Sequence, residues 1–220
     1  MPKETFKNLP DKKRQLIEKE AIHEFAVSGY DKASISRIVD KCRIAKGSFY
    51  QYFDGKKDLF LYLVKRIGEK KLKFLTPVLK NQQQYDFYTL NRELFTEGLK
   101  FAAENPELTI MGNWLFKNSS HPIYNEVMGV GLRNAQDVYG KLLKNAISRG
   151  EVRDNIDLDF ASHMISSMNV SVIEYYFNNI KREKGRMLKL DEGIIEIVDL
   201  LIDFIKNGIG THGKGDNEND

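Results

Sequence analysis

Apolar residues recur at helical spacing along nearly the whole chain, and this pattern constrains the fold more than any other feature. Ile35, Ile38, Val39 and Cys42 stand at i, i+3, i+4 and i+7, which places them on one face of an α-helix. No stretch shows the sustained apolar–polar alternation of a half-buried β-strand. The spacing predicts helices over residues 11–29, 34–42, 45–53, 56–77, 87–103, 106–117, 122–149, 158–181 and 191–207. We therefore expect an all-α protein.

Composition and charge narrow the classes of function. Cys42 is the only cysteine, which excludes an internal disulfide and a thiolate metal cluster, and the 4 histidines are scattered. No segment approaches the ~18 uninterrupted apolar residues of a membrane span. The opening stretch MPKETFKNLPDKKRQ lacks the apolar core of a secretory signal. We expect no cofactor, no metal and no membrane partner, and a cytoplasmic location.

The positive charge is concentrated near the beginning of the chain. Through Lys57 there are 13 Lys and Arg against 8 Asp and Glu, whereas the remainder has 21 against 23. The N-terminal part of the chain through Lys57, called the head below, is basic, and the remainder is slightly acidic. This distribution favours a polyanion as the partner of the head.

The first three predicted helices have the layout of a helix-turn-helix, because a tight turn at Arg43–Ile44 separates the second from the third. Apolar side chains on these helices can form one small core, with Phe49 and Phe53 contributed by the third. The other face of the third helix is then left outward, and it carries Lys46, Gly47, Ser48, Tyr50, Gln51 and Tyr52.

The outward residues suit duplex DNA. Lys46 can reach a phosphate or a guanine edge, and Gln51 can bond adenine. Gly47 has no side chain, so the backbone can approach a groove closely. The hydroxyls of Tyr50 and Tyr52 can donate to phosphates, which position a protein without reading sequence.

The stretch from Glu20 to Phe60 resembles the DNA-binding domain of the tetracycline-repressor (TetR) family. The matching residues are Ala21, Phe25, Gly29, Tyr30, Ser34, Ile35, Ile38 and Val39, followed by AKGSFYQYF and GKKDLF. The resemblance implies a bacterial, all-α homodimer of about nine helices. It also implies that operator DNA is contacted by Ser34, Ser36, Arg37, Lys46, Gly47, Ser48, Tyr50, Gln51, Tyr52 and Lys56. Two positions depart from the family pattern. Arg43 stands where many relatives have glycine, and Ala45 stands where many have the serine or threonine that caps the third helix.

The resemblance divides the chain into a DNA-binding domain at residues 1–55 and a ligand-binding and dimerisation domain at 56–210. The last ten residues, 211–220, have no apolar content, and we expect them to form a disordered tail. Apolar stripes on the last two helices are candidates for the dimer interface, mainly because of the resemblance, and the alternative is that they form core within one subunit. The stripes comprise Phe160, Met164, Val172, Tyr176, Ile194, Val198, Leu201, Ile202 and Ile205.

Aromatic and methionine side chains between the fifth and eighth predicted helices are candidates for lining an effector pocket, since such walls suit a hydrophobic or flat ligand. Simple core packing explains each of them equally well. These residues are Phe95, Phe101, Met111, Trp114, Phe116, Met128, Tyr139, Met168 and Tyr175.

The expected function is a ligand-responsive regulator, most simply a repressor, that binds a palindromic operator as a homodimer and is released by a small hydrophobic or aromatic effector. One alternative is an activator, or a nucleoid or division regulator without an effector. The other is a helical enzyme with a vestigial DNA-binding head. Ser119, Ser120 and His121 are adjacent, but the sequence contains no pattern of nucleophile and base, so we expect no catalysis.

Overall fold

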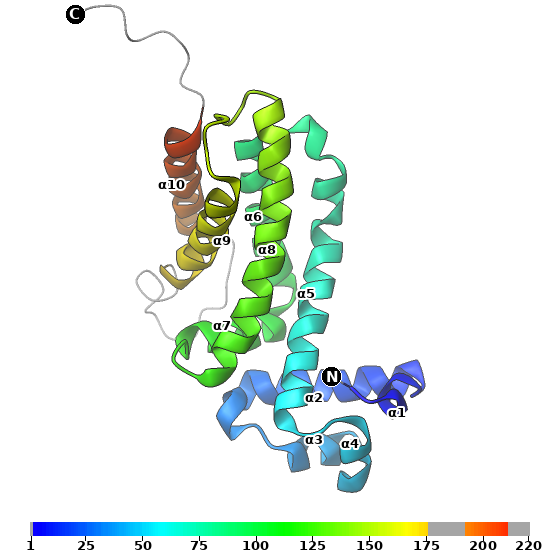
Figure 1. Cartoon of the computed structure of the whole chain (residues 1–220). Coiled ribbons are helices and arrows are strands. Elements are labelled where there is room, and N and C mark those ends of the chain that lie inside the picture. Colours follow the sequence, from blue (N-terminus) through cyan, green and yellow to red (C-terminus); the bar gives the residue numbers. More distant parts are fainter. Residues whose placement is uncertain (1, 176–191, 211–220) are drawn as a thin grey trace, which may run out of the picture. The chain divides into compact units, whose positions relative to one another are not determined.

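The computed structural model describes residues 2–175 and 192–210, and in these ranges every regular element is a helix (Figure 1). An isolated bridge between Val152 and Gly210 adds no sheet. The helices are α1 (Glu4–Lys7), α2 (Asp11–Lys32), α3 (Ile35–Lys41), α4 (Lys46–Tyr52), α5 (Lys56–Lys80), the 3₁₀ helix η1 (Gln82–Gln84), α6 (Phe87–Glu104), α7 (Pro106–Lys117), α8 (Pro122–Ser148), α9 (Leu158–Tyr175) and α10 (Glu192–Ile209). The all-α expectation is confirmed. Among the described helices, none combines the length and the apolar character needed to cross a bilayer.

Two helices end three residues later than the sequence predicts, and the other ends agree within two residues where the structure describes them. α2 continues to Lys32 instead of ending at Gly29, and Gly29 interrupts it with a φ of 69°. α5 runs past Pro77 to Lys80, since a proline removes one hydrogen bond without ending every helix that contains it. The short elements α1 and η1 were not predicted. Residues 176–181 of the eighth predicted helix and the tail at 211–220 lie outside the described residues.

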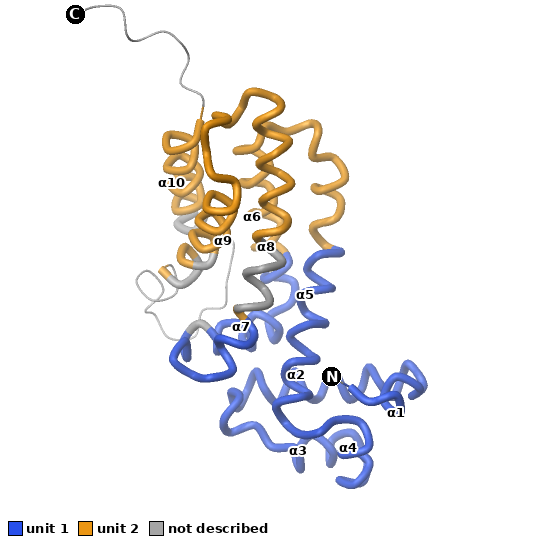
Figure 2. Tube along the Cα trace, viewed as in Figure 1, with its two compact units in different colours: residues 1–73, 101–127 blue, residues 74–100, 128–220 orange. Residues whose placement is uncertain are grey.

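The chain forms two compact units, shown in Figure 2. Unit 1 comprises residues 1–73 and 101–127, and unit 2 comprises residues 74–100 and 128–220. This division differs from the boundary expected at residue 55, because the beginning of α5 and all of α7 pack with the helices at the beginning of the chain. Periodicity predicts the apolar face of a helix such as α7, but it does not say which partner covers that face.

The core of unit 1 joins the head to α7. Large side chains of α2, α4 and α5 are almost fully buried, and Met111 and Leu115 of α7 lie in the same cluster. Its members are Phe6, Ile17, Ala21, Phe25, Ala33, Ile38, Val39, Cys42, Phe49, Tyr52, Phe53, Leu59, Phe60, Tyr62, Leu63, Met111, Leu115 and Ile123. Cys42 belongs to this core, and burial raises the pKa of its thiol to about 11, so the thiol is kept protonated near neutral pH.

Unit 2 uses much of the predicted dimer stripe for its own core. Val198, Leu201 and Ile205 of α10 are buried within the subunit, and Val172 and Ile202 pack against the same cluster. Val198, Leu201 and Ile205 therefore belong to the subunit core, the alternative for this stripe, whereas Val172 and Ile202 stay half-buried. Met164 is half-buried, whereas Phe160 is 65% exposed. The side chains of Tyr176 and Ile194 lie outside the described residues.

Candidate DNA interface

The outer face of α4 carries residues that the sequence predicts to contact DNA. Lys46, Gly47, Tyr50 and Gln51 are exposed, and Ser48 is half-buried. On the opposite side Phe49 and Phe53 are completely buried, which holds the helix against the core. A Cβ built on Gly47 would meet no atom within 4 Å, so the backbone is open on that side. The arrangement offers polar side chains and accessible backbone to a groove.

Tyr52 does not belong to this outer face, which corrects the sequence interpretation. Its side chain is only 7% exposed and lies in the core of unit 1. The ring of Phe6 packs on it, with ring centroids 5.9 Å apart. Phe6 comes from α1, which the sequence did not predict, so its covering of Tyr52 could not be anticipated.

The turn before α4 shows both departures noted in the sequence. Arg43 adopts a φ of 53°, the only positive φ of a non-glycine residue in the described ranges. This left-handed conformation explains why glycine would suit the position. Ala45 occupies the N-cap of α4 and supplies no side-chain hydrogen bond. The beginning of α4 is therefore held by packing and by the turn, without a polar cap.

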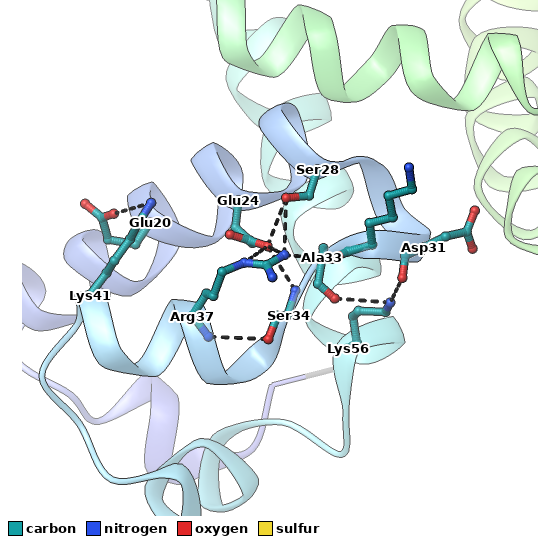
Figure 3. A network of polar contacts seen from close by, with 10 residues as sticks. Glu20, Glu24, Ser28, Asp31, Ala33, Ser34, Arg37, Lys41 and Lys56 are labelled. Atoms are coloured by element: carbon teal, nitrogen blue, oxygen red, sulfur yellow. Dashed lines mark hydrogen bonds and ion pairs between the residues drawn. The ribbon is translucent and has the colours of Figure 1, made fainter.

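The first turn of α3 is held by a buried carboxylate. Glu24 of α2 is 4% exposed and accepts hydrogen bonds from the Ser34 amide (3.0 Å), from Ser28 Oγ (3.1 Å) and from the Arg37 guanidinium (Nε, 2.9 Å), as Figure 3 shows. Burial opposes ionisation of Glu24, but these donors together outweigh it, so its pKa is lowered. Ser34 caps α3 as expected, since its Oγ accepts from the Arg37 amide.

Arg37 and Lys56, both predicted DNA contacts, are held within the head. The Arg37 guanidinium also donates to the Lys32 carbonyl at 2.7 Å. Lys56 Nζ donates to the carbonyls of Asp31 (2.8 Å) and Ala33 (3.3 Å), which close the junction between α2 and α3. The two carbonyls use two of the three donors of the ammonium, and Nζ also lies 4.8 Å from the centroid of the Tyr30 ring. Ser36 and Arg37 are both exposed on α3, whereas Lys56 is half-buried.

His121 contributes to structure within unit 1. Its Nδ1 accepts a hydrogen bond from the Ile123 amide at 3.2 Å, and its Nε2 lies 3.3 Å from Asp31 Oδ1. Both ring nitrogens are thus engaged, which leaves neither to activate a serine hydroxyl as a base. The adjacency of Ser119, Ser120 and His121 is accordingly explained by the end of α7.

The nine candidate effector residues are divided between the two units. Phe101 and Met111 are buried in unit 1, and Trp114 packs beside Tyr30 with ring centroids 5.6 Å apart. In unit 2, Phe95, Met128, Tyr139 and Met168 are half-buried and Tyr175 is exposed. The side chain of Phe116 lies outside the described residues. Burial and the hydrogen bond that the Tyr139 hydroxyl accepts from Asn169 (2.7 Å) act in opposite directions, and burial prevails, raising the pKa of Tyr139 to about 12.

Comparison with known proteins agrees with this geometry. The family profile "Bacterial regulatory proteins, tetR family" matches residues 17–63, which span α2 to the beginning of α5. A TetR family transcriptional regulator from Chloroflexus aurantiacus is 28% identical with a TM-score of 0.66, over 96% of this chain and 100% of that one.

Two further solved structures share the fold at lower identity. The regulator FadR from Bacillus subtilis, in complex with stearoyl-CoA, is 17% identical with a TM-score of 0.65, over 89% of this chain and 98% of that one. SmeT, the repressor of the Stenotrophomonas maltophilia multidrug efflux pump SmeDEF, is 16% identical with a TM-score of 0.69, over 94% of each chain. The matched profile and the likeness along nearly the whole chain lead to one conclusion: residues 17–63 form a helix-turn-helix of the tetR family of bacterial regulatory proteins, and the chain as a whole is similar to a TetR family transcriptional regulator.

Proposed function

We propose that the protein is a ligand-responsive repressor that binds a palindromic operator as a homodimer and leaves it when a hydrophobic or aromatic effector binds. The observation that carries the proposal is the outer face of α4, where Lys46, Tyr50 and Gln51 project beside an unobstructed Gly47. Repression is favoured because SmeT, which shares the fold, is a repressor.

DNA recognition is tested by selecting bound duplexes from a randomised pool. We expect a palindrome whose half-sites lie about 34–36 Å apart or somewhat more, because two symmetry-related α4 helices enter the major groove on one side of the duplex. The affinity should fall steeply as salt rises, since bound phosphates release counterions. Enrichment of no sequence, together with a flat dependence of affinity on salt, would contradict the proposal.

Dimerisation through α9 and α10 is supported by apolar side chains that unit 2 leaves exposed. Phe160 is 65% exposed, Leu200 70% and Phe204 65%. Phe160 and Phe204 also line an apolar pocket of about 330 Å³ between α9 and α10, together with Met164 and Met168. Fully burying one such side chain is worth about 1.5–3 kcal/mol, so covering this face with a second copy would stabilise the protein substantially.

The dimer is tested with Phe204→Glu, which places a charge in the proposed interface. Sedimentation velocity should show a dimer for the unmodified chain and a monomer for the variant. Val138→Glu on α8 is the matched control, because Val138 is 38% exposed in the same unit and lies outside the proposed interface. A Phe204→Glu variant that remains dimeric would contradict the assignment of this face.

The nature of the effector is inferred from the composition of the candidate residues and from the relatives. Stearoyl-CoA and triclosan, bound to FadR and SmeT in solved structures that share this fold, both carry extended apolar groups. We infer an effector of the same character, contacted by some of the nine aromatic and methionine side chains. The test is the dissociation constant of the selected operator with stearoyl-CoA, with triclosan and with free coenzyme A as the control. A dissociation constant unaffected by any apolar compound would count against ligand control.

α7 offers a route by which an effector can influence the head, because it contacts α2 at both ends. Near its beginning, Glu107 Oε1 lies 2.7 Å from His23 Nδ1, and near its end the Trp114 ring packs beside Tyr30. A ligand that favours a shifted α7 would change these contacts and lower DNA affinity by mass action.

A reporter fused to the regulated promoter distinguishes a repressor from an activator. Deletion of the gene that encodes this protein should raise reporter expression if the protein is a repressor and lower it if the protein is an activator.

A further inference from the structure

The recognition helix α4 is too short to be stable alone. It has seven residues, whereas isolated helices shorter than about 12–15 residues are marginal in water. Its beginning has no side-chain cap, and its last turn has no basic residue to interact with the helix dipole. No glycine in a left-handed conformation follows it, because its C-cap residue Phe53 is extended. The end of α4 therefore needs partners from elsewhere in the chain.

The last four carbonyls of a helix lack donors within it. In α4, the segment Pro2–Leu9 supplies hydrogen-bond donors to three of these four carbonyls. Lys3 Nζ donates to the Tyr50 carbonyl at 2.9 Å, and the Lys3 amide donates to the Tyr52 carbonyl at 2.9 Å. The hydroxyl of Thr5 donates to the Gln51 carbonyl. The remaining carbonyl, that of Phe49, accepts from the Phe53 amide at 2.9 Å. Every carbonyl at the end of α4 is thus satisfied.

Packing and charge hold the same segment in place. Phe6 is 1% exposed and its ring lies 4.7 Å from that of Phe53 and 5.4 Å from that of Tyr62, measured between centroids. The Lys3 ammonium pairs with Asp54 Oδ1 at 2.7 Å, just beyond α4, and its hydrogen bond lowers the pKa of the Asp54 carboxyl. The ammonium also lies at the negative end of the α4 dipole, where a positive charge is favourable.

We propose that the segment Pro2–Leu9 is a positioning element for DNA recognition, in which Lys3 and Thr5 set the orientation of Tyr50 and Gln51 by holding their carbonyls. Of the three residues whose carbonyls are held, Tyr50 and Gln51 face outward at the end of α4 and Tyr52 is buried, and the outward pair is held through the side chains of Lys3 and Thr5. A loosened end would let Gln51 leave the geometry that a bidentate contact to a base requires. The proposal rests on DNA binding through α4, and its first test needs no DNA.

The first test is amide hydrogen exchange of the free protein, comparing Thr5→Val and Lys3→Met with the unmodified chain. Each hydrogen bond lost should speed exchange at the end of α4 about two- to ten-fold, since a net hydrogen bond is worth roughly that factor. Lys7→Met is the matched control, because Lys7 lies in the same segment but pairs with Glu4. Thr96→Val is a second control, because it removes the same kind of hydrogen bond, from a threonine hydroxyl to the Arg92 carbonyl, in unit 2. Exchange at residues 49–54 that is unchanged in both test variants would overturn the proposal.

The second test measures selectivity on the duplex that the unmodified chain selects from a randomised pool. That selection succeeds or fails independently of the segment, so failure of the proposed function is recognised at this stage. Thr5→Val should weaken discrimination at the base pair read by Gln51 about two- to ten-fold. In a Gln51→Ala background the same change should have no further effect at that base pair, since coupled residues are not additive.

The dependence of affinity on salt separates positioning from direct contact. If Lys3 positions α4, Lys3→Met weakens specific binding while the slope of log affinity against log salt is unchanged. If Lys3 binds a phosphate, the slope falls by about one and exchange in α4 is unaffected, which would overturn the proposal. Full additivity of Thr5→Val with Gln51→Ala would overturn it as well.

Discussion

Replacing Glu24 by glutamine is expected to destabilise the DNA-binding head without changing its shape. One oxygen of this carboxylate, Oε1, accepts from the Ser34 amide, from the Ser28 hydroxyl and from the Arg37 guanidinium. The side chain is 5% exposed, so water does not replace these partners. A glutamine keeps the shape and one acceptor oxygen but removes the negative charge, so the loss falls on the charge-assisted part of these bonds.

The expected magnitude follows from the difference between charged and neutral hydrogen bonds. Bonds to a charged group contribute about 1.5–3 kcal/mol and neutral ones about 1 kcal/mol. The Arg37 side chain is 53% exposed, so solvent screens its share, and we assign the effect to the buried carboxylate and the Ser34 amide. We therefore expect Glu24→Gln to lower the free energy of unfolding by about 1–2 kcal/mol.

The assay is urea unfolding followed by tryptophan fluorescence, since Trp114 is the only tryptophan and lies in unit 1. Glu20→Gln is the matched control, because Glu20 lies one turn earlier on α2 and its carboxylate is 4.0 Å from Lys41 Nζ. The control should lose less than about 0.5 kcal/mol.

The effect should depend on pH in a defined direction. The pKa of Glu24 is lowered in the folded protein, so its contribution is complete above the ordinary carboxyl pKa of about 4.3 and is lost as pH falls through the folded-state value. The difference between the unmodified chain and Glu24→Gln should therefore narrow in acid. Equal stability at pH ~7, or a difference that stays constant down to pH ~3, would refute the role given to this carboxylate.

Four further substitutions test other parts of the head. Gly29→Ala should destabilise unit 1 by about 2 kcal/mol or more, because φ is 69° and a Cβ would lie 2.8 Å from Trp114 Nε1; a melting temperature equal to that of the unmodified chain would contradict this. Gly47→Ala should leave stability unchanged or raise it by up to about 1 kcal/mol and still weaken operator binding, as measured by fluorescence anisotropy. Tyr50→Phe should weaken operator binding several-fold, whereas Tyr52→Phe should not, because only Tyr50 is exposed; equal losses would show that exposure does not decide the contact.

Local patterns in the sequence were sufficient for the class of fold and for most of the residues exposed on the outer face of α4. The period of about 3.6 residues predicted the helices, and the bounds of α7 are those expected from Pro106 to Lys117. Arg43 was singled out because glycine is common at its position, and it adopts a left-handed backbone. Lys46, Tyr50 and Gln51 face outward because Phe49 and Phe53, on the same helix, fix which side is buried. Such features depend on residues close together in the chain.

Features that depend on distant segments were decided by the tertiary structure alone. Phe6 covers Tyr52, and Lys3 and Thr5 satisfy carbonyls of α4 that lie 46–47 residues away. The apolar stripe of α10 was visible in the sequence, but burial of Leu201 and exposure of Phe204 follow from which neighbours cover it. Helical periodicity specifies that a face is apolar, whereas the surface that removes it from water is set by the packing of the whole unit.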